Sequence, residues 1–360
     1  MYLTQLDICQ VRNLQNVSII PGKRYNYIFG ENGSGKTSLL EAIYLLSLAR
    51  SFRTNHIKQV ISHNSDFLRV FARLNLADDV KNTTIGIERT KLKTRIRING
   101  TDSQNVAELS SLLPIQIINP DVHKLLEQGP KMRRQFVDWG VFHVEHQFLH
   151  TWQQYYRVLK QRNAGLRKKL PGKVVSTWDP QLIDLAKKIT LDRESYISHF
   201  LPYFNIYVEK LIGLKVEIKY HRGWNNEFSL TDTLAKSFEK DVYRGFTASG
   251  PHRADLQILY NGFPVQEVFS RGQHKLLVCA MRLSQISYLE KELGQKCVIL
   301  VDDLSAELDE KHRQRLLELL IDTQAQLFLT ATERDSIRLP MENNSKMFHV
   351  EHGILKEVVQ

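Results

Sequence analysis

Residues 30–37 read Gly30-Glu31-Asn32-Gly33-Ser34-Gly35-Lys36-Thr37, which fits the phosphate-loop pattern G-x-x-x-x-G-K-[ST]. A mostly apolar stretch at 25–29 precedes the loop, and helical spacing of apolar residues follows it from Thr37 to Leu48. Glycines allow a tight turn whose N–H groups point at phosphate oxygens, and the following helix presents its positive end to the same anion. We therefore expect bound ATP and Mg²⁺, with Lys36 at the β and γ phosphates and Thr37 on the metal.

A second stretch of sequence supplies the acidic residues that a phosphate loop needs. Residues 297–301 are all apolar, as in a strand buried on both faces of a parallel sheet, and Asp302 and Asp303 follow directly. Ligands bind at the carboxyl ends of strands in such sheets. We expect Asp302 to hold Mg²⁺ through water, and Asp303 to orient or deprotonate the attacking water. Asp303, Asp302 and Lys36 form the predicted catalytic set.

Two further segments narrow the class of phosphate-loop protein. Ser270-Arg271-Gly272-Gln273 opens an apolar helix before the acidic strand, and Ser305-Ala306-Glu307-Leu308-Asp309 follows the acidic pair. This order of motifs resembles the ABC ATPase plan. The resemblance implies that Ser270, Gly272 and Gln273 of one subunit cap the γ-phosphate held by another subunit. Taken alone, the segment also fits an ordinary capped helix.

Composition sets the broad class of protein. The chain has 360 residues, of which 42% are hydrophobic and 24% charged, so a disordered or fibrous chain is excluded. No apolar run approaches a membrane span and the start lacks a leader pattern, so we expect a cytoplasmic protein without a membrane partner. Three scattered cysteines (Cys9, Cys279 and Cys297) fit reduced core residues. The net charge of +10 favours a polyanionic partner without proving one.

Three segments follow along the chain. Residues 1–120 form the first part of an ATPase head, with the phosphate loop and short strands that turn at Asp78-Asp79 and Asn99-Gly100. Residues 121–246 read as consecutive helices, and residues 247–360 return to alternating strands and helices that carry the later motifs. The predicted fold class is α/β: a P-loop ABC-type ATPase head with an antiparallel β subdomain and an inserted helical lobe.

Within the ABC class the sequence most resembles the RecF family of bacterial recombination-repair ATPases, which is related to SMC-type heads. The resemblance extends through most of the chain and rests on these segments: 11–14 (Val-Arg-Asn-Leu), 39–43, 51–54 (Ser-Phe-Arg-Thr), 129–138, 159–163 and 249–255 (Ser-Gly-Pro-His-Arg-Ala-Asp). It implies that Arg12 and Asp309 join residues 30–37 and Ser270–Gln273 in binding ATP.

The same resemblance implies a biology that spacing and composition do not. It implies an ATP-dependent homodimer and a weak, DNA-dependent ATPase that binds double-stranded and gapped DNA. It further implies RecR and RecO as partners in placing RecA on single strands, with roles in replication restart and the SOS response.

Three positions depart from other ABC ATPases. No glutamine loop follows the expected strand at 115–118, and Thr330 and Thr332 stand where a switch histidine is usual. Asp303 replaces the usual glutamate, and a side chain one methylene shorter reaches less far toward the attacking water. We therefore expect slow hydrolysis, which suits a timed clamp better than a pump.

Basic residues concentrate in the helical segment. Residues 131–173 hold ten Lys or Arg against two acidic residues, together with Trp152, Tyr155 and Tyr156. Such helices suit contacts to a nucleic-acid backbone, although a solvated helical face would look similar. The DNA contacts predicted here are Arg133, Arg134, Lys160 and Arg162.

A second basic stretch alternates with less polar residues. If residues 89–97 form one strand, its cations lie on one face about 7 Å apart and can follow a row of phosphates. The outer face of an antiparallel sheet would also look like this. These predicted contacts are Arg89, Lys91, Lys93, Arg95 and Arg97.

Two other functions remain open from the sequence. A transporter ATPase subunit is disfavoured by the missing glutamine loop and switch histidine, and by the basic helical segment. A structural DNA-binding protein could use ATP only as an assembly switch. In that case Lys36 would matter and Asp303 would not, because a switch needs nucleotide binding alone.

Overall fold

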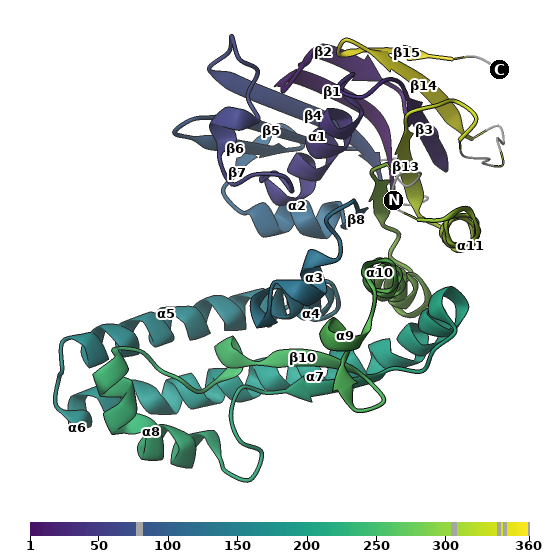
Figure 1. Ribbon diagram of the computed structural model, residues 1–360. Helices are drawn as coiled ribbons and strands as arrows, with labels where there is room; N and C mark the ends of the chain where they lie inside the picture. Colours follow the sequence, from purple (N-terminus) through teal and green to yellow (C-terminus); the bar gives the residue numbers. More distant parts are fainter. Residues whose placement is uncertain (77–81, 304–307, 337–339, 341–343, 359–360) are drawn as a thin grey trace. The chain divides into compact units, whose positions relative to one another are not determined.

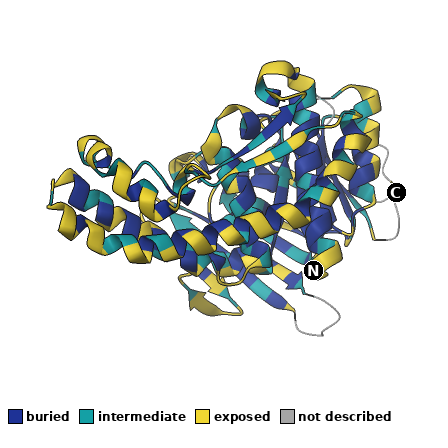
Figure 2. Cartoon of the chain, turned by 90° about the horizontal axis from the view of Figure 1, so that it is seen from below, coloured by how far each residue is buried: buried dark blue, intermediate teal, exposed yellow. Residues whose placement is uncertain are grey.

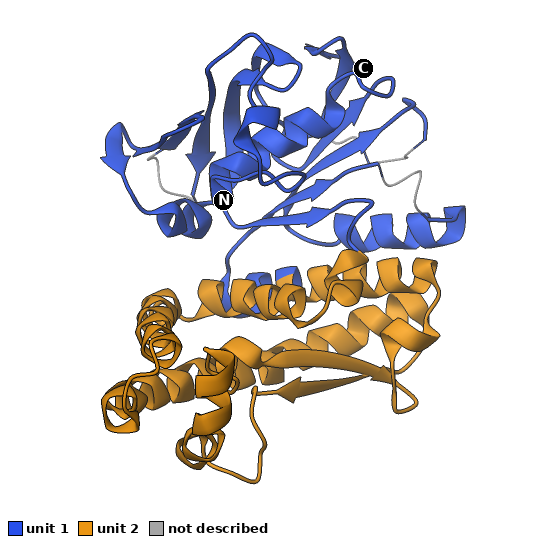
Figure 3. Cartoon of the chain, turned by 60° about the vertical axis from the view of Figure 1, so that its left-hand side comes forward, with its two compact units in different colours: residues 1–122, 286–360 blue, residues 123–285 orange. Residues whose placement is uncertain are grey.

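The computed structural model describes residues 1–76, 82–303, 308–336, 340 and 344–358. The chain divides into two compact units, coloured separately in Figure 3. The first unit combines Met1–Val122 with Ile286–Gln360, and the second is His123–Gln285. We expected residues 247–285 with the ATPase head, whereas the compact units group them with the helical segment.

A mostly parallel sheet forms one layer of the first unit (Figure 1), in the order β15-β14-β3-β13-β12-β8. Its strands are β3 (Tyr25–Phe29), β8 (Ile115–Ile118), β12 (Val298–Val301), β13 (Gln326–Ala331), β14 (Lys346–Glu351) and β15 (Ile354–Glu357). Every residue of β12 is buried, as the apolar run at 297–301 predicted, and every residue of β13 is buried as well. Because β3, β13 and β12 run parallel, the phosphate loop after β3 and the acidic pair after β12 lie at the same edge.

The second layer of this unit is an antiparallel sheet in the order β2-β1-β4-β5-β6-β7. Its strands are β1 (Tyr2–Val11), β2 (Leu14–Ile19), β4 (Phe67–Asn75), β5 (Thr83–Thr90), β6 (Thr94–Ile98) and β7 (Thr101–Ser103). The Asn99-Gly100 turn is confirmed, with positive φ at both residues. The Asp78-Asp79 turn lies outside the described residues.

Helix α1 (Lys36–Leu48) packs between the two sheets of the first unit. Its apolar side chains share one core with β1, β4 and β5 on one side and with β3, β12 and β13 on the other. Helices α2 (Val106–Leu112) and α11 (Glu310–Ile321) complete the described helices that lie wholly in this unit, apart from one short 3-10 turn. Burial of about ten residues of α1 fixes the helix, and with it the loop that precedes it.

The second unit is mainly helical. Its helices are α3 (Lys124–Glu127), α4 (Pro130–Val144), α5 (Phe148–Arg167), α6 (Gly172–Val175), α7 (Asp179–Ile212), α8 (Leu230–Arg244), α9 (Val265–Val268) and the first part of α10 (Arg271–Leu293). The long helices have both buried and exposed residues, whereas β12 and β13 of the first unit are buried throughout (Figure 2). No helix in the described ranges is long and apolar enough to cross a membrane.

A small sheet explains why residues after 246 belong to the second unit. Strand β10 (Asp255–Tyr260) pairs with β9 (Glu217–His221) and with the short β11 (Phe263–Pro264). Asp255 also accepts two hydrogen bonds from Arg133 on α4. The prediction missed β9 because only five residues form it, although Ile218 and Tyr220 alternate with polar residues.

Candidate nucleotide site and basic surfaces

The backbone of the phosphate loop requires glycine at several positions. Gly30 has φ of 153°, and a Cβ atom there would collide with the carbonyl oxygen of Val350 on β14. Gly35 has φ of 125° and occupies the N-cap of α1. Because Gly35 carries no capping side chain, the first N–H groups of α1 stay available to an anion.

Two segments support the loop from behind. Asn13, in the turn between β1 and β2, donates from Nδ2 to the carbonyl oxygens of Ser34 at 2.9 Å and Gly33 at 3.3 Å. Gly353, in the turn between β14 and β15, donates from its backbone N–H to the same Ser34 oxygen at 2.8 Å. These bonds hold the carbonyl groups away from the interior of the loop. The prediction did not select Asn13, although it lies in the segment 11–14 that carried the family resemblance.

Two polar side chains in the loop are poised for an anion. The ammonium of Lys36 is buried and donates to the carbonyl oxygens of Gly30 at 2.6 Å and Glu31 at 2.8 Å. Burial lowers its pKa, while Asp303 and Asp302 act in the opposite direction. The hydroxyl of Ser34 is also buried and has no hydrogen-bond partner among the described residues. A triphosphate would supply the missing acceptors, so the loop fits that ligand.

A cluster of oxygen ligands lies beside the loop. Thr37 Oγ1 donates to Asp302 Oδ1 at 2.9 Å, and Thr330 Oγ1, on β13, donates to the same oxygen at 2.9 Å. Burial raises the pKa of Asp302, and these two hydroxyls partly oppose that rise. A hydroxyl and a carboxylate are ligands that Mg²⁺ prefers when phosphates and water complete its shell. The described residues contain no group of three or more His, Cys, Asp or Glu side chains that could hold a metal ion by themselves.

Asp303 follows Asp302 in an unusual backbone conformation. Its φ is 48°, and its N–H donates to Thr330 Oγ1 at 2.9 Å. The structure therefore brings together Lys36, Thr37, Asp302 and Asp303, as the sequence predicted. Thr330 was noted only as a replacement for a histidine, and its contacts were not foreseen.

Arg12 occupies a different contact from the one expected. Its guanidinium forms a bidentate ion pair with Glu41 of α1, at 2.8 and 2.9 Å. Glu41 is fully buried and also accepts a hydrogen bond from Ser51, while Arg53 lies 3.7 Å away. The segments 11–14 and 51–54 therefore meet at one carboxylate of α1. Arg12 can bind nucleotide only if it shares or leaves this carboxylate.

The Ser270–Gln273 segment forms a capping box at the start of α10. The backbone N–H of Ser270 donates to Gln273 Oε1 at 2.9 Å, and Gln273 N–H donates to Ser270 Oγ at 3.3 Å. Ser270 and Gly272 are exposed. Around Gly272 a Cβ atom would meet nothing nearer than Ser270 Oγ, at 4.0 Å, so a ligand can approach this backbone closely.

The last predicted nucleotide contact lies at the start of another helix. Asp309 is the N-cap of α11 and accepts from the backbone N–H of His312 at 3.0 Å. Residues 305–307 of the same motif lie outside the described residues.

The arginines predicted to bind DNA in the helical segment are mostly internal, and this corrects the prediction. Arg162 is fully buried and pairs with Asp179 at 2.7 Å and Asp241 at 3.3 Å. Arg133 is 7% exposed and forms its bidentate pair with Asp255. A guanidinium enclosed in this way cannot reach a phosphate. Arg134 donates to the carbonyl oxygen of Ala254 and is half-buried, while Lys160 is exposed as expected.

These arginines hold the 249–255 segment that carried part of the family resemblance. Arg193 of α7 pairs with Asp138 of α4 and donates to the carbonyl oxygen of Pro251 at 2.7 Å. Tyr155 of α5 contacts His252 Nδ1 at 2.6 Å, and burial lowers the pKa of His252 to about 4. Three helices therefore anchor this segment. Its role in the described structure is to join the helices of the second unit.

The expected row of cations is not one strand, which also corrects the prediction. The chain reverses at residues 91–93, so β5 ends at Thr90 and β6 begins at Thr94. Arg95 pairs in register with Glu88, whereas Arg89 pairs with Thr94 and therefore lies on the opposite face. Arg89 donates to the carbonyl oxygen of Ala49 on the core side, and burial lowers its pKa. A single-strand pattern could not foresee a turn made of Lys91, Leu92 and Lys93.

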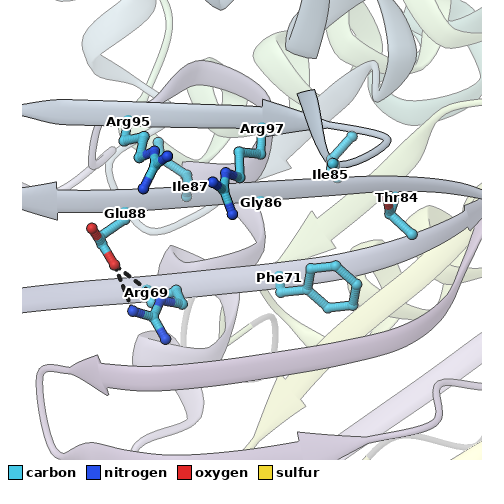
Figure 4. Close-up of a pocket in the computed structure, with 10 residues that line it drawn as sticks. Arg69, Phe71, Thr84, Ile85, Gly86, Ile87, Glu88, Arg95 and Arg97 are labelled. Carbon is cyan, nitrogen blue, oxygen red and sulfur yellow. Dashed lines mark hydrogen bonds and ion pairs between the residues drawn. The ribbon is translucent and has the colours of Figure 1, made fainter. Parts of the chain in front are cut away.

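The outer face of the antiparallel sheet is hollowed rather than lined by free cations. Figure 4 shows Arg95 and Arg97 on one strand, Glu88 on the next and Arg69 beyond it. These residues and Phe71 line a cavity of about 420 Å³. Most of the positive charges are paired: Arg69 with Glu88, and both Arg95 and Arg97 with Asp102.

The two lysines at the turn between β5 and β6 are exposed to solvent. Lys91 pairs with Asp66 at 3.1 Å, and both residues are exposed. Leu92, between the two lysines, is 99% exposed. Exposed ion pairs contribute little to stability, so these cations can exchange an acidic partner for a phosphate at small cost.

Comparisons with known proteins agree on one family. Residues 2–356 match the family described as the RecF/RecN/SMC N terminal domain. A Cellvibrio japonicus protein called DNA replication and repair protein RecF is 44% identical over 360 residues, covering 98% of each chain. A protein of the same name from Pseudomonas paraeruginosa is 43% identical, covering 98% of this chain and 97% of that protein.

Solved structures give the same result for the fold. A structure described as the recombination mediator protein RecF-ATP in the RecFOR pathway aligns with a TM-score of 0.88 at 26% identity, covering 99% of this chain and 98% of that chain. An SMC head bound to part of ScpA aligns with a TM-score of 0.61 at 18% identity over 99% and 97%, which supports the ATPase-head fold alone. The chain therefore belongs to the RecF family of DNA replication and repair proteins.

Proposed function

We propose that this chain is an ATP-dependent DNA-binding protein of recombinational repair and replication restart. ATP joins two copies on duplex or gapped DNA, and slow hydrolysis releases them. The observation that carries the proposal is the phosphate loop, in which Lys36 bonds only to backbone carbonyl groups and the Ser34 hydroxyl to nothing among the described residues, while Asp302 and Asp303 lie at the same sheet edge. The solved relative described with ATP supports it.

The residues at this edge of the sheet have different roles in ATP hydrolysis. Lys36 and the N–H groups of the loop bind the phosphates, and Thr37 with Asp302 would hold Mg²⁺. The metal supplies charge neutralisation at the phosphate oxygens when it is bound. Asp303 orients the attacking water or accepts its proton. Its short side chain limits that reach, so a turnover well below one per second is expected.

Dimerisation explains the exposed start of α10. Ser270 and Gly272 present a capped helix end with open space above the glycine. Such an end favours negative charge. In the proposed dimer it contacts the γ-phosphate held by the other copy, as the ABC resemblance implies.

DNA would be contacted by the exposed cations that remain after the corrections above. They are Lys91, Lys93, Arg95, Arg97 and Lys160. From the family resemblance we further propose RecR and RecO as protein partners, RecA loading as the downstream step, a role in SOS induction and a cytoplasmic location. None of these follows from the geometry.

The decisive experiment measures binding to gapped duplex, plain duplex and single-stranded DNA at one fixed salt concentration, with and without Mg-ATP. ATP should tighten binding to gapped or plain duplex at least tenfold. Lys36→Ala and Ser270→Arg should each lose this gain and keep the ATP-free affinity. Equal binding with and without ATP in the unmodified protein would contradict the clamp.

A third variant separates an enzyme from an assembly switch. Asp303→Asn should keep ATP binding and DNA closure but lose release, because only hydrolysis needs the carboxylate. The DNA complex should then persist at least tenfold longer than that of the unmodified protein. Unchanged release would favour the switch.

A further inference from the structure

Thr330 lies where strand β13 joins the two halves of the proposed nucleotide site. Strand β13 is hydrogen-bonded to β3 on one side and β12 on the other, and Thr330 pairs in register with Ile28, two residues before the loop. Its neighbour Leu329 pairs with Val301, directly before Asp302. Thr330 is 0% exposed, so its hydroxyl must find partners inside the protein.

The donor and the acceptor can be assigned in each hydrogen bond of the Thr330 hydroxyl. The backbone N–H of Asp303 can only donate, so Thr330 Oγ1 accepts there at 2.9 Å. The single hydroxyl proton then has two possible acceptors, Asp302 Oδ1 at 2.9 Å and the carbonyl oxygen of Val301 at 3.5 Å. The shorter bond and the charged acceptor favour the carboxylate. Thr330 therefore accepts from one acidic residue and donates to the other.

This arrangement constrains both carboxylates. Thr37 and Thr330 both donate to Oδ1 of Asp302, which fixes the rotamer and leaves Oδ2 outside these two bonds. Asp303 has φ of 48°, a left-handed conformation that is strained for a non-glycine residue. The bond to Thr330 holds that strained residue by its N–H and so sets the direction of its side chain.

We propose that Thr330 is a positioning residue for ATP hydrolysis, which aligns Asp302 and Asp303 with the nucleotide bound at the loop. The inference rests on the proposed ATPase function. It adds a residue on a third strand, which acts through its hydrogen bonds to Asp302 and Asp303. A misplacement of about 1 Å at such a site can cost about 100-fold in rate, although the fold is intact.

The test compares Thr330→Val, which keeps the shape and removes the hydroxyl, with Thr330→Ser, which keeps the hydroxyl. Thr330→Val should lower kcat for ATP about 10- to 100-fold with KM within about threefold, and Thr330→Ser should stay within about threefold of the unmodified protein. ATP binding is measured separately, by a fluorescent analogue with Mg²⁺ and with EDTA. Thr330→Val should reduce the gain from Mg²⁺ and leave the affinity in EDTA unchanged.

Thr323→Val is the matched control. Thr323 is 3% exposed, lies in the same unit and donates to the carbonyl oxygen of Leu320 at 2.7 Å, away from the acidic pair. It should lose stability comparably and keep both kcat and the Mg²⁺ effect. A similar loss of rate in Thr323→Val, or an unchanged kcat in Thr330→Val, would overturn the inference alone. An unmodified protein that binds no ATP would overturn the proposed function and this inference together.

Discussion

The phosphate loop and the helical unit both hold buried, positively charged side chains, but these side chains have different kinds of partner. Around Lys36 the direct hydrogen-bond acceptors are backbone carbonyl groups, and the hydroxyl of Ser34 beside it has no hydrogen-bond partner in the described part of the chain. Around Arg162 the acceptors are two carboxylates, one of them fully buried, and the hydroxyl of Thr247. The positive charge of Lys36 is left for a ligand, whereas that of Arg162 is paired with acidic residues of its own unit.

The difference teaches that a buried basic residue is available to a ligand only when no acidic residue forms an ion pair with it. Asp179 and Asp241 are 17 and 79 residues from Arg162 along the chain, so a local charge count does not see them. The net charge of a segment therefore overestimates the number of cations that are available to bind a ligand. The predictions below test this contrast, beginning with the largest effect.

The largest expected effect is on folding. Arg162→Ala should lower the free energy of unfolding by about 3–5 kcal/mol, because it removes the positive charge that pairs with buried Asp241. Urea unfolding followed by tryptophan fluorescence measures this, since all four tryptophans lie in the helical unit. Lys160→Ala, on the exposed side of the same helix, should change it by less than about 0.5 kcal/mol. Equal effects in the two variants would contradict the contrast.

Lys36→Ala should act on the ligand and not on the fold. A charge-assisted contact to phosphate contributes about 1.5–3 kcal/mol, so ATP affinity should fall at least about tenfold. Titration with a fluorescent ATP analogue checks this. The urea midpoint of the same variant should stay close to that of the unmodified protein, because no carboxylate loses a direct salt-bridge partner.

His143 is a buried basic side chain whose contribution to stability depends on pH. It is buried beside Trp139, its Nε2 has no described partner, and burial lowers its pKa to about 3. The unfolded chain takes up a proton below about pH 6.5 and the folded chain does not, so stability falls as pH falls, by about 1.4 kcal/mol per pH unit. His143→Leu should flatten this loss between pH 6.5 and 5. Urea unfolding at both pH values measures it, and an unchanged slope would contradict the burial.

The smallest expected effect on stability is at the cavity on the outer face of the antiparallel sheet. Arg97→Ala breaks an exposed pair with Asp102 and should cost less than about 0.5 kcal/mol. If Arg97 contacts DNA, the slope of log affinity against log salt should decrease by about one. Binding isotherms at several salt concentrations decide this. An unchanged slope would remove Arg97 from the DNA surface.

The sequence predicted the parts of this protein that depend on local spacing. The phosphate loop, the buried strand before Asp302 and the helical segment are each encoded in consecutive residues, and the structure agrees with them. Strand β1 was missed because Thr4, Gln5 and Asp7 mask its apolar face. Asn13, Thr330 and Asp241 were missed for another reason: their partners are distant in sequence, and only tertiary packing brings them together.

The turn between β14 and β15 has a consequence for how the protein is made. Strand β3 lies between β13 and β14, and Gly353 completes the support of Ser34. A ribosome that has synthesised residues 30–37 must still add more than 280 residues before β13 begins and more than 300 before Gly353 exists. Nucleotide cannot stabilise the nascent head during that time, and the loop stays exposed to chaperones and proteases. A chain that stops before β13 is expected to lack nucleotide binding altogether.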